Sequence, residues 1–336
     1  MAKTTKTGTL VHERLESRAL VGNALGDPSE RDVFVYLPPQ YGTNPKQRFP
    51  VIHVIVGFTG MGASPFQRTF FGEALQDRMD RLIRARKIPP LILATPDCMT
   101  SLGGSQYVNS AATGAYETFV VKEVVPFVDA GFRTKAAARH RAICGKSSGG
   151  YGALMLGMKY PKVFGALASH SGDAYFDYCY RLDFVKCWNA LRAAGGVEKW
   201  LRAFRKKTKV GGDDIHALNI IAMAACYSPD EASPYGFELP FDLETGEERA
   251  EIMRRWRRVD PVHAAKRYAG NLKQLRGIFI DCGLRDEWAL QVGARVLSSR
   301  LKGLGIRHVH QEFDDGHMGI SYRYDVSFPH LAKWIS

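Results

Sequence analysis

The sequence predicts an α/β fold in which a mostly parallel central sheet carries helices on both faces. Short, almost continuously apolar runs, such as residues 51–56 and 91–94, are typical of strands that are covered on both sides. Segments of helical character follow these runs repeatedly, and such alternation favours a parallel sheet. A third observation is a stretch of roughly a hundred residues that interrupts this rhythm and predicts an insertion.

The strands are expected in the following order. Residues 8–18 mix apolar and polar side chains without a clean period, which favours a half-buried edge strand. Residues 31–37 form a second strand, closed by Pro38 and Pro39, and the two strands are expected to pair in antiparallel fashion. The later predicted strands are residues 50–56, 90–95, 141–144, 164–170, 275–281 and 308–313.

Helical segments are expected between these strands. The predicted helices outside the insertion are residues 65–86, 115–132, 151–158, 287–301 and 322–335. Residues 57–62 form a glycine-rich loop, and residues 100–114 form a long polar loop.

The insertion is predicted to be a helical cap over the carboxyl edge of the sheet. It contains apolar helices near residues 184–205 and 214–226, followed by a section with prolines and glycines at 228–246. The sequence therefore predicts a core of residues 1–172 and 270–336, with a cap or lid of residues 173–269 between two core strands.

Composition is ordinary for a soluble globular protein, with 45% hydrophobic and 24% charged residues. No apolar run approaches the roughly 18 residues of a membrane span, and the first residues lack the apolar core of a secretory signal. We therefore expect a cytoplasmic protein without a membrane partner. The six cysteines form no CxxC pair, so neither a disulfide framework nor a zinc site is expected.

The formal net charge of +12 is partly concentrated. Residues 181–210 carry nine lysines and arginines against two acidic residues, and residues 254–258 form a second basic cluster. A solvated basic helix face is the favoured interpretation, and attraction of anionic substrates or nucleic acid is the alternative. Because no nucleic-acid-binding motif accompanies the charge, no nucleic-acid partner is predicted.

The motif with the clearest chemistry is Gly145-Lys146-Ser147-Ser148-Gly149-Gly150. It lies between a predicted strand and a predicted apolar helix, which is the context of a G-x-S-x-G nucleophile elbow. Glycines are needed two residues before and after the serine, because side chains there would collide with neighbouring backbone. Ser147 has Gly145 and Gly149 at these positions, so Ser147 is the expected nucleophile.

A serine nucleophile needs a histidine base, which follows the serine in hydrolases of this type. Of the seven histidines after Ser147, His317 lies in a flexible loop just past the last predicted strand, where the fold would deliver a base. His308 and His310 share a face of that strand, and His330 lies inside the final helix, so these residues are expected to be structural or exposed.

The base in turn needs an acid, and the loop after the preceding strand supplies candidates. Asp286 is favoured because it lies in the turn that opens the next helix. Glu287 and Asp281 are alternatives in the same segment, and Asp173 is a more distant choice. An aspartate at this position could also be a helix N-cap.

Backbone N–H groups are expected to stabilise the oxyanion of the reaction. One should come from Ser148 and the other from the 57–60 loop, most plausibly from Phe58, although an ordinary glycine turn is the alternative for this loop. Substrate contacts are expected from Gly57, Thr59 and Lys146, and the aromatic cap adds Tyr175 and Phe176. Cap aromatics are also interpreted as the cap's own small core.

Several further segments support a family resemblance. They are residues 33–41, 116–126, 149–154, 160–164 and 316–317. On these segments the chain resembles the Putative esterase family of α/β-hydrolases, which groups esterase D (S-formylglutathione hydrolase), feruloyl and acetylxylan esterases, enterochelin esterase and mycolyltransferases. The chain departs from this family at Val56, where relatives usually have histidine, and at Lys146 and Ser148, where they often read G-H-S-M-G-G.

The sequence therefore predicts a serine carboxylesterase that forms an acyl-enzyme on Ser147, with a small-molecule ester as its partner and no metal or organic cofactor. The alternatives are an acyltransferase with the same three residues, a feruloyl or acetyl-sugar esterase, a thioesterase similar to S-formylglutathione hydrolase, and a non-enzymatic binding protein. Aromatic and basic cap residues favour an aryl or anionic acyl ester only slightly. The sequence is compatible with a homo-oligomer.

Overall fold

Eight strands form the central sheet in the order β1-β2-β4-β3-β7-β8-β9-β10. The computed structural model describes residues 7–336, so the first residues, on which the expectation about a secretory signal depends, lie outside the described part. The strands are β1 (Thr9–Glu16), β2 (Glu30–Leu37), β3 (Val51–Ile55), β4 (Ile92–Pro96), β7 (Arg141–Lys146), β8 (Ala166–His170), β9 (Gly277–Gly283) and β10 (Val309–Phe313).

The strand directions follow the predicted pattern. β1 pairs with β2 and β2 pairs with β4 in antiparallel fashion, and every pair from β4 to β10 is parallel. A separate two-stranded ribbon, β5 (Asn109–Ser110) and β6 (Gly114–Ala115), lies in the predicted long loop. The mostly parallel sheet with helices around it is thereby confirmed.

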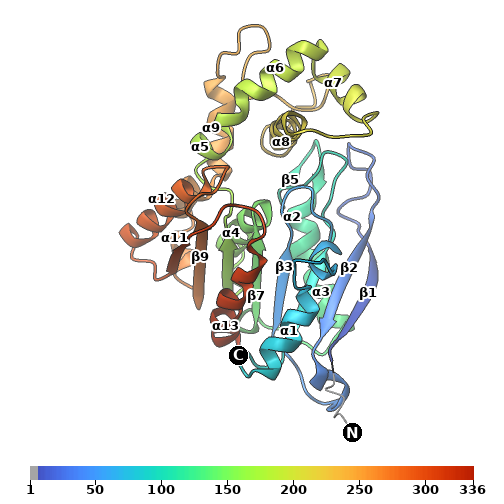
Figure 1. Cartoon of the computed structure of the whole chain (residues 1–336), viewed down its shortest axis with the longest axis vertical. Helices are drawn as coiled ribbons and strands as arrows, with labels where there is room; N and C mark the ends of the chain where they lie inside the picture. Colours follow the sequence, from blue (N-terminus) through green and yellow to red (C-terminus); the bar gives the residue numbers. More distant parts are fainter. Residues whose placement is uncertain (1–6) are drawn as a thin grey trace.

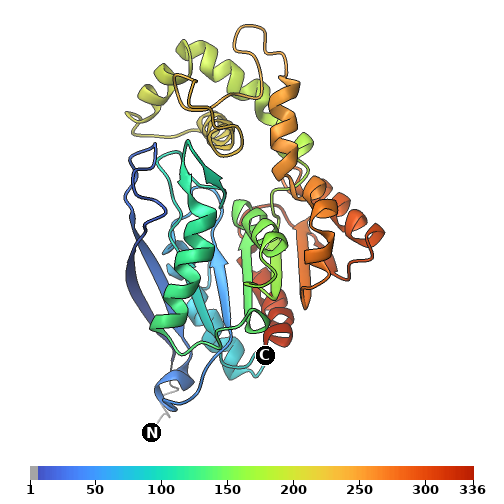
Figure 2. The same cartoon turned by 180° about the vertical axis from the view of Figure 1, so that it is seen from behind.

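Helices cover both faces of the sheet, as Figures 1 and 2 show from opposite sides. Alternate side chains of β3 explain this arrangement: Ile52 and Val54 join one buried cluster, and Val51 and Ile55 join the other. On the first face lie α1 (Leu75–Arg84) and α13 (Tyr324–Ile335). On the second face lie α2 (Tyr116–Thr118), α3 (Val125–Gly131), α4 (Ser148–Lys159) and α12 (Leu290–Gly303), and a π-helical segment, Phe119–Val124, joins α2 to α3.

Two predicted helices differ from the structure. The helix expected at 65–86 begins only at Leu75 and is preceded by a short 3₁₀ helix, Ser64–Phe66. Phe70 and Phe71, between the two, are more than nine-tenths exposed, so this part of the chain buries no apolar face that would hold a helix. The helix expected at 184–205 is broken by Gly195 and Gly196, whose φ angles of +78° and +114° are outside the helical region.

The chain between β8 and β9 forms a group of helices. They are α5 (Phe176–Cys179), α6 (Phe184–Ala194), α7 (Val197–Phe204), α8 (Gly212–Tyr227), α9 (Ala250–Val259), α10 (Pro261–Arg267) and α11 (Ala269–Leu272). Of these, α6, α7 and α8 lie over the end of the sheet opposite the two termini (Figure 1). The last two helices of the group, α10 and α11, already pack against α12 and α4 of the core. The division of the chain at residues 173 and 269 stays a prediction.

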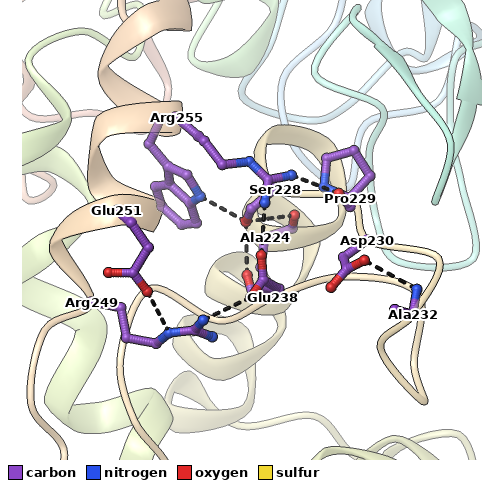
Figure 3. A network of polar contacts seen from close by, with 10 residues as sticks. Ala224, Ser228, Pro229, Asp230, Ala232, Glu238, Arg249, Glu251 and Arg255 are labelled. Atoms are coloured by element: carbon purple, nitrogen blue, oxygen red, sulfur yellow. Dashed lines mark hydrogen bonds and ion pairs between the residues drawn. The ribbon is translucent and has the colours of Figure 1, made fainter.

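Part of the basic charge of the cap is neutralised within the cap (Figure 3). Arg249 and Arg255 each bind the carboxylate of Glu238 at 2.7 Å. Next to them, the indole of Trp256 donates to the hydroxyl of Ser228 at 2.9 Å. These contacts tie α9 to the chain that follows α8, so Arg255 of the second basic cluster, together with Arg249, stabilises the cap.

All six cysteines are buried, and each has a free thiol. Burial raises the pKa of every one of these thiols, because the thiolate would be poorly solvated. Among residues 7–336, no helix combines the length and the apolar character that crossing a membrane requires.

The turn between β7 and α4 is pressed against the end of β3. A Cβ atom added to Gly149 would lie 2.2 Å from the carbonyl oxygen of Ile55, and one added to Gly145 would lie 2.4 Å from the carbonyl of Gly149. Both contacts are with backbone, which cannot rotate away. Glycine is therefore required at both positions for steric reasons, as the sequence pattern predicts.

We predict that Gly149→Ala lowers the free energy of unfolding by about 1–3 kcal/mol, because the added methyl group overpacks the turn. The matched control is Gly131→Ala at the end of α3, where no atom lies within 4 Å of the added Cβ. The measurement is urea denaturation of both variants. Equal stabilities for the two variants would contradict the steric requirement.

Candidate active site

Ser147 occupies the point where β7 passes into α4. Its φ and ψ angles are 58° and −127°, a region that residues with a side chain rarely adopt. The amide of Ser147 donates to the carbonyl of His170 at 2.9 Å, which helps to hold the strained turn in place. This conformation holds the serine above the carboxyl edge of the sheet, as expected for a nucleophile elbow.

His317 follows β10 and reaches the serine from the neighbouring loop. Its Nε2 lies 3.0 Å from Oγ of Ser147, and its Nδ1 lies 2.7 Å from Oδ2 of Asp286. A carboxylate only accepts hydrogen bonds, so the ring proton resides on Nδ1 and leaves Nε2 to accept from the serine hydroxyl. The structure thus brings together the three residues that the sequence predicts.

The surroundings of His317 fix its orientation. The second oxygen of Asp286 accepts the backbone N–H of Trp288 at 3.0 Å, and the indole of Trp288 packs against the imidazole with ring centroids 4.7 Å apart. Glu287 accepts the backbone N–H of His317 at 2.7 Å. Glu287 therefore holds the loop, whereas the carboxylate of Asp286 contacts the imidazole itself.

The other acidic candidates lie elsewhere. Asp281 binds Nδ1 of His170 at 2.6 Å and the guanidinium of Arg323 at 2.8 Å, behind the nucleophile. Asp173 accepts from the hydroxyls of Ser148 and Tyr180. Neither carboxylate has a hydrogen bond to His317 among the described residues.

The 57–60 loop lies directly beside the nucleophile. A Cβ atom on Gly57 would lie 3.2 Å from Cβ of Ser147, which shows how closely the loop approaches the serine. The amide of Thr59 donates to Gly103 at 2.7 Å and anchors the loop. Within residues 7–336, the amides of Phe58 and Ser148 donate to no protein acceptor, so both are available to an oxyanion.

A cavity of about 610 Å³ opens in front of Ser147. Its walls include Gly57, Phe58, Thr59 and Lys146, as predicted for the binding site. The cap also contributes walls: Tyr180, one of the cap aromatics, and Cys179, Ile215 and Asn219, which the sequence does not single out as substrate contacts. A surface hollow of about 750 Å³ lies between residues 39–43 and the end of α1, and none of the predicted site residues lines it.

Comparison with known proteins identifies the family. Residues 23–324 match the model of the family described as Putative esterase. The chain belongs to this family.

Esterase Rv1288 of Mycobacterium tuberculosis is 30% identical over 210 residues, which are 60% of this chain and 44% of that protein. An endo-1,4-beta-xylanase/feruloyl esterase of Xylanibacter ruminicola is 30% identical over 144 residues, which are 42% of this chain and 19% of that protein. The chain therefore spans less than half the length of these relatives.

Solved structures show the same fold. A ferulic acid esterase superposes with a TM-score of 0.65 at 18% identity, over 98% of this chain and 99% of that one. An S-formylglutathione hydrolase from Agrobacterium tumefaciens superposes with a TM-score of 0.60 at 16% identity, over 99% and 98% of the two chains. The α/β-hydrolase fold of this member of the esterase family is thereby confirmed.

The structure does not place Tyr175 and Phe176 in the cavity of this esterase-family chain. Phe176 is fully buried and packs against Tyr227, with ring centroids 5.1 Å apart. Tyr175 stacks on Tyr178 with ring centroids 5.2 Å apart. Neither is among the residues that line the cavity. Phe176 thus belongs to the buried core of the cap, the alternative interpretation of such residues, and Tyr175 is half-buried beside the exposed Tyr178.

A buried polar network beside the nucleophile has no signal in the sequence. The hydroxyl of Ser148 accepts from Gln106 at 2.8 Å and donates to Asp173 at 3.0 Å. Tyr180 of the cap donates to the same oxygen of Asp173 at 2.8 Å. Ser148 thus has two functions in the structure: its backbone amide faces the cavity, and its side chain connects the elbow to the cap.

Burial raises the pKa of Asp173, against the opposing effect of the hydrogen bonds from Tyr180 and Ser148. In the described part of the chain, no group of three or more histidine, cysteine or acidic side chains is arranged to hold a metal ion.

We predict that Asp173→Asn becomes increasingly stabilising relative to wild type as the pH rises from about 3 to neutrality. A carboxyl group with a raised folded pKa contributes most to stability below its unfolded pKa of about 3.9, and this contribution is lost as the pH passes the folded value. The amide has no charge to bury, and its oxygen can still accept both hydroxyl hydrogen bonds. The measurement is the free energy of unfolding of both proteins across this pH range. A difference that shrinks with rising pH would contradict the prediction.

Proposed function

We propose that this chain is a serine carboxylesterase, in which Ser147, His317 and Asp286 act as a catalytic triad. The observation that supports the proposal most directly is the continuous chain of contacts at 3.0 Å and 2.7 Å that joins the three side chains, of which Ser147 and His317 line the cavity. Membership of the esterase family supports the same reaction class.

In the proposed reaction, Oγ of Ser147 attacks the ester carbonyl while Nε2 of His317 takes the hydroxyl proton. The negative charge of Asp286 stabilises the imidazolium that forms. The carbonyl oxygen becomes an oxyanion, which the backbone amides of Phe58 and Ser148 would bind. His317 then gives the proton to the leaving alcohol, an acyl-enzyme remains, and a water molecule activated by the same histidine releases the acid.

The proposed substrate is a small-molecule ester with an apolar or aromatic part. The cavity walls include Ile215, Trp288 and Leu290, which favour such a group through apolar burial. Relatives and structural neighbours that are named feruloyl or ferulic acid esterases make aryl esters the first class to examine.

We predict that a fluorophosphonate probe labels the wild-type protein and that Ser147→Ala abolishes labelling. The same substitution should lower kcat on aryl esters by about 10⁴-fold or more, because the nucleophile is removed. Ser299→Ala on the exposed face of α12 is the matched control and should label like the wild type. An unlabelled wild type, or equal labelling of Ser147→Ala, would rule out the proposed reaction.

A second prediction separates the candidate acids. Asp286→Asn should lower kcat by on the order of 10⁴-fold, because the amide favours the wrong tautomer of His317. Asp281→Asn should chiefly reduce stability, because Asp281 binds His170 and Arg323 and does not contact His317. Single-turnover rates per folded molecule measure the rate loss of each variant, and urea denaturation measures its stability. A larger rate loss for Asp281→Asn would overturn the assignment.

A further inference from the structure

The cavity in front of the nucleophile contains a cation that forms no ion pair with any acidic side chain of residues 7–336. Lys146 directly precedes Ser147, is half-buried and lines the cavity. Among the described residues, its ammonium group has no ion pair, and its one polar contact is the sulfur of Met318 at 3.9 Å. Burial accordingly lowers the pKa of this ammonium group.

The carboxylates nearest to this ammonium are already bound to other groups. Asp286 binds the imidazole of His317, and Glu287 binds the backbone amide of the same residue. Asp173 binds the hydroxyls of Ser148 and Tyr180. A half-buried cation without a partner is unfavourable, and a ligand that supplies an anion would remove this cost.

A smaller side cavity of about 180 Å³ extends from this lysine. Ser321 and Tyr324 line both the side cavity and the main cavity. Within residues 7–336, neither of their hydroxyl groups donates a hydrogen bond to a protein acceptor. The lining of the side cavity therefore includes one charged donor and two neutral donors, which suit a carboxylate. His170 also lines it, but both of its ring nitrogens are already bound, to Asp281 and Ser327.

The position of the side cavity indicates which part of the ester would enter it. In the proposed reaction His317 protonates the leaving alcohol, so the alcohol part must lie beside that residue. Four of the residues that line the side cavity, Gly319, Ile320, Ser321 and Tyr324, follow directly after the histidine loop. Met318, which joins the two segments, contacts the ammonium of Lys146 through its sulfur at 3.9 Å.

We propose that Lys146, with the hydroxyls of Ser321 and Tyr324, binds a carboxylate on the alcohol part of the substrate. The protein would then act on esters of hydroxy acids. This inference rests on the proposed esterase reaction and specifies its substrate class. The carboxylate makes and breaks no bond, because it orients the ester and neutralises the lysine.

The test compares 4-acetoxybenzoate with its uncharged amide, 4-acetoxybenzamide. For each protein, kcat/KM for the acid is divided by kcat/KM for the amide. This acid-to-amide ratio should be about tenfold or more higher in the wild type than in Lys146→Met, which is the range expected for a hydrogen bond to a charged group. Dividing by the ratio for the variant removes the intrinsic difference in reactivity between the two esters. Lys146→Arg should retain most of the preference, and Lys333→Met, on an exposed position of α13, should retain all of it.

Protection from fluorophosphonate labelling supplies a readout that does not depend on turnover. The product 4-hydroxybenzoate should protect Ser147 of the wild type better than 4-hydroxybenzamide does, and Lys146→Met should abolish the difference. Equal acid-to-amide ratios in wild type and Lys146→Met, with equal protection by the two products, would overturn this inference while labelling of Ser147 still supports the esterase reaction. If Ser147 is not labelled at all, the proposed function itself fails.

Discussion

The site depends on a steric constraint at the carboxyl end of β7. The backbone of the elbow lies so close to β3 and to the chain after β8 that no side chain fits at Gly149 or Gly150; a Cβ atom on Gly150 would lie 2.7 Å from Cα of Gly172. This close approach places Ser147 in its strained conformation and brings the 57–60 loop against it. The positions of nucleophile and oxyanion donors are therefore two results of one packing arrangement.

Much of the fold could be predicted because its signals are local. Strands buried on both faces appear in the sequence as continuous apolar runs, and such runs predict β3 and β7. The roles of His317 and Asp286 could be predicted because these residues follow neighbouring strands, and in a parallel sheet the loops after neighbouring strands meet at one edge. The predicted start of the first helix is wrong by ten residues, because Phe70 and Phe71 in its first part face solvent and bury no apolar surface that would hold a helix there.

The polar network around Ser148 could not be predicted for a different reason. Gln106 and Asp173 are 42 and 25 residues away in the chain, and only the packing of the cap brings Tyr180 onto the same carboxylate. No short pattern marks such contacts. The same difficulty applies to Phe176, because an aromatic residue that lines a cavity and one that fills a core have the same local sequence character.

Five of the six buried cysteines lie away from the cavity in front of Ser147, so they react with thiol reagents only when the protein opens; Cys179 lines that cavity. Cys98, Cys144 and Cys282 lie around the sheet, whereas Cys187 and Cys226 lie in the cap helices. A thiol reacts only as its thiolate and only when a reagent can reach it. The order in which the two groups of cysteines are alkylated would therefore distinguish local opening of the cap from global unfolding, without any change to the sequence.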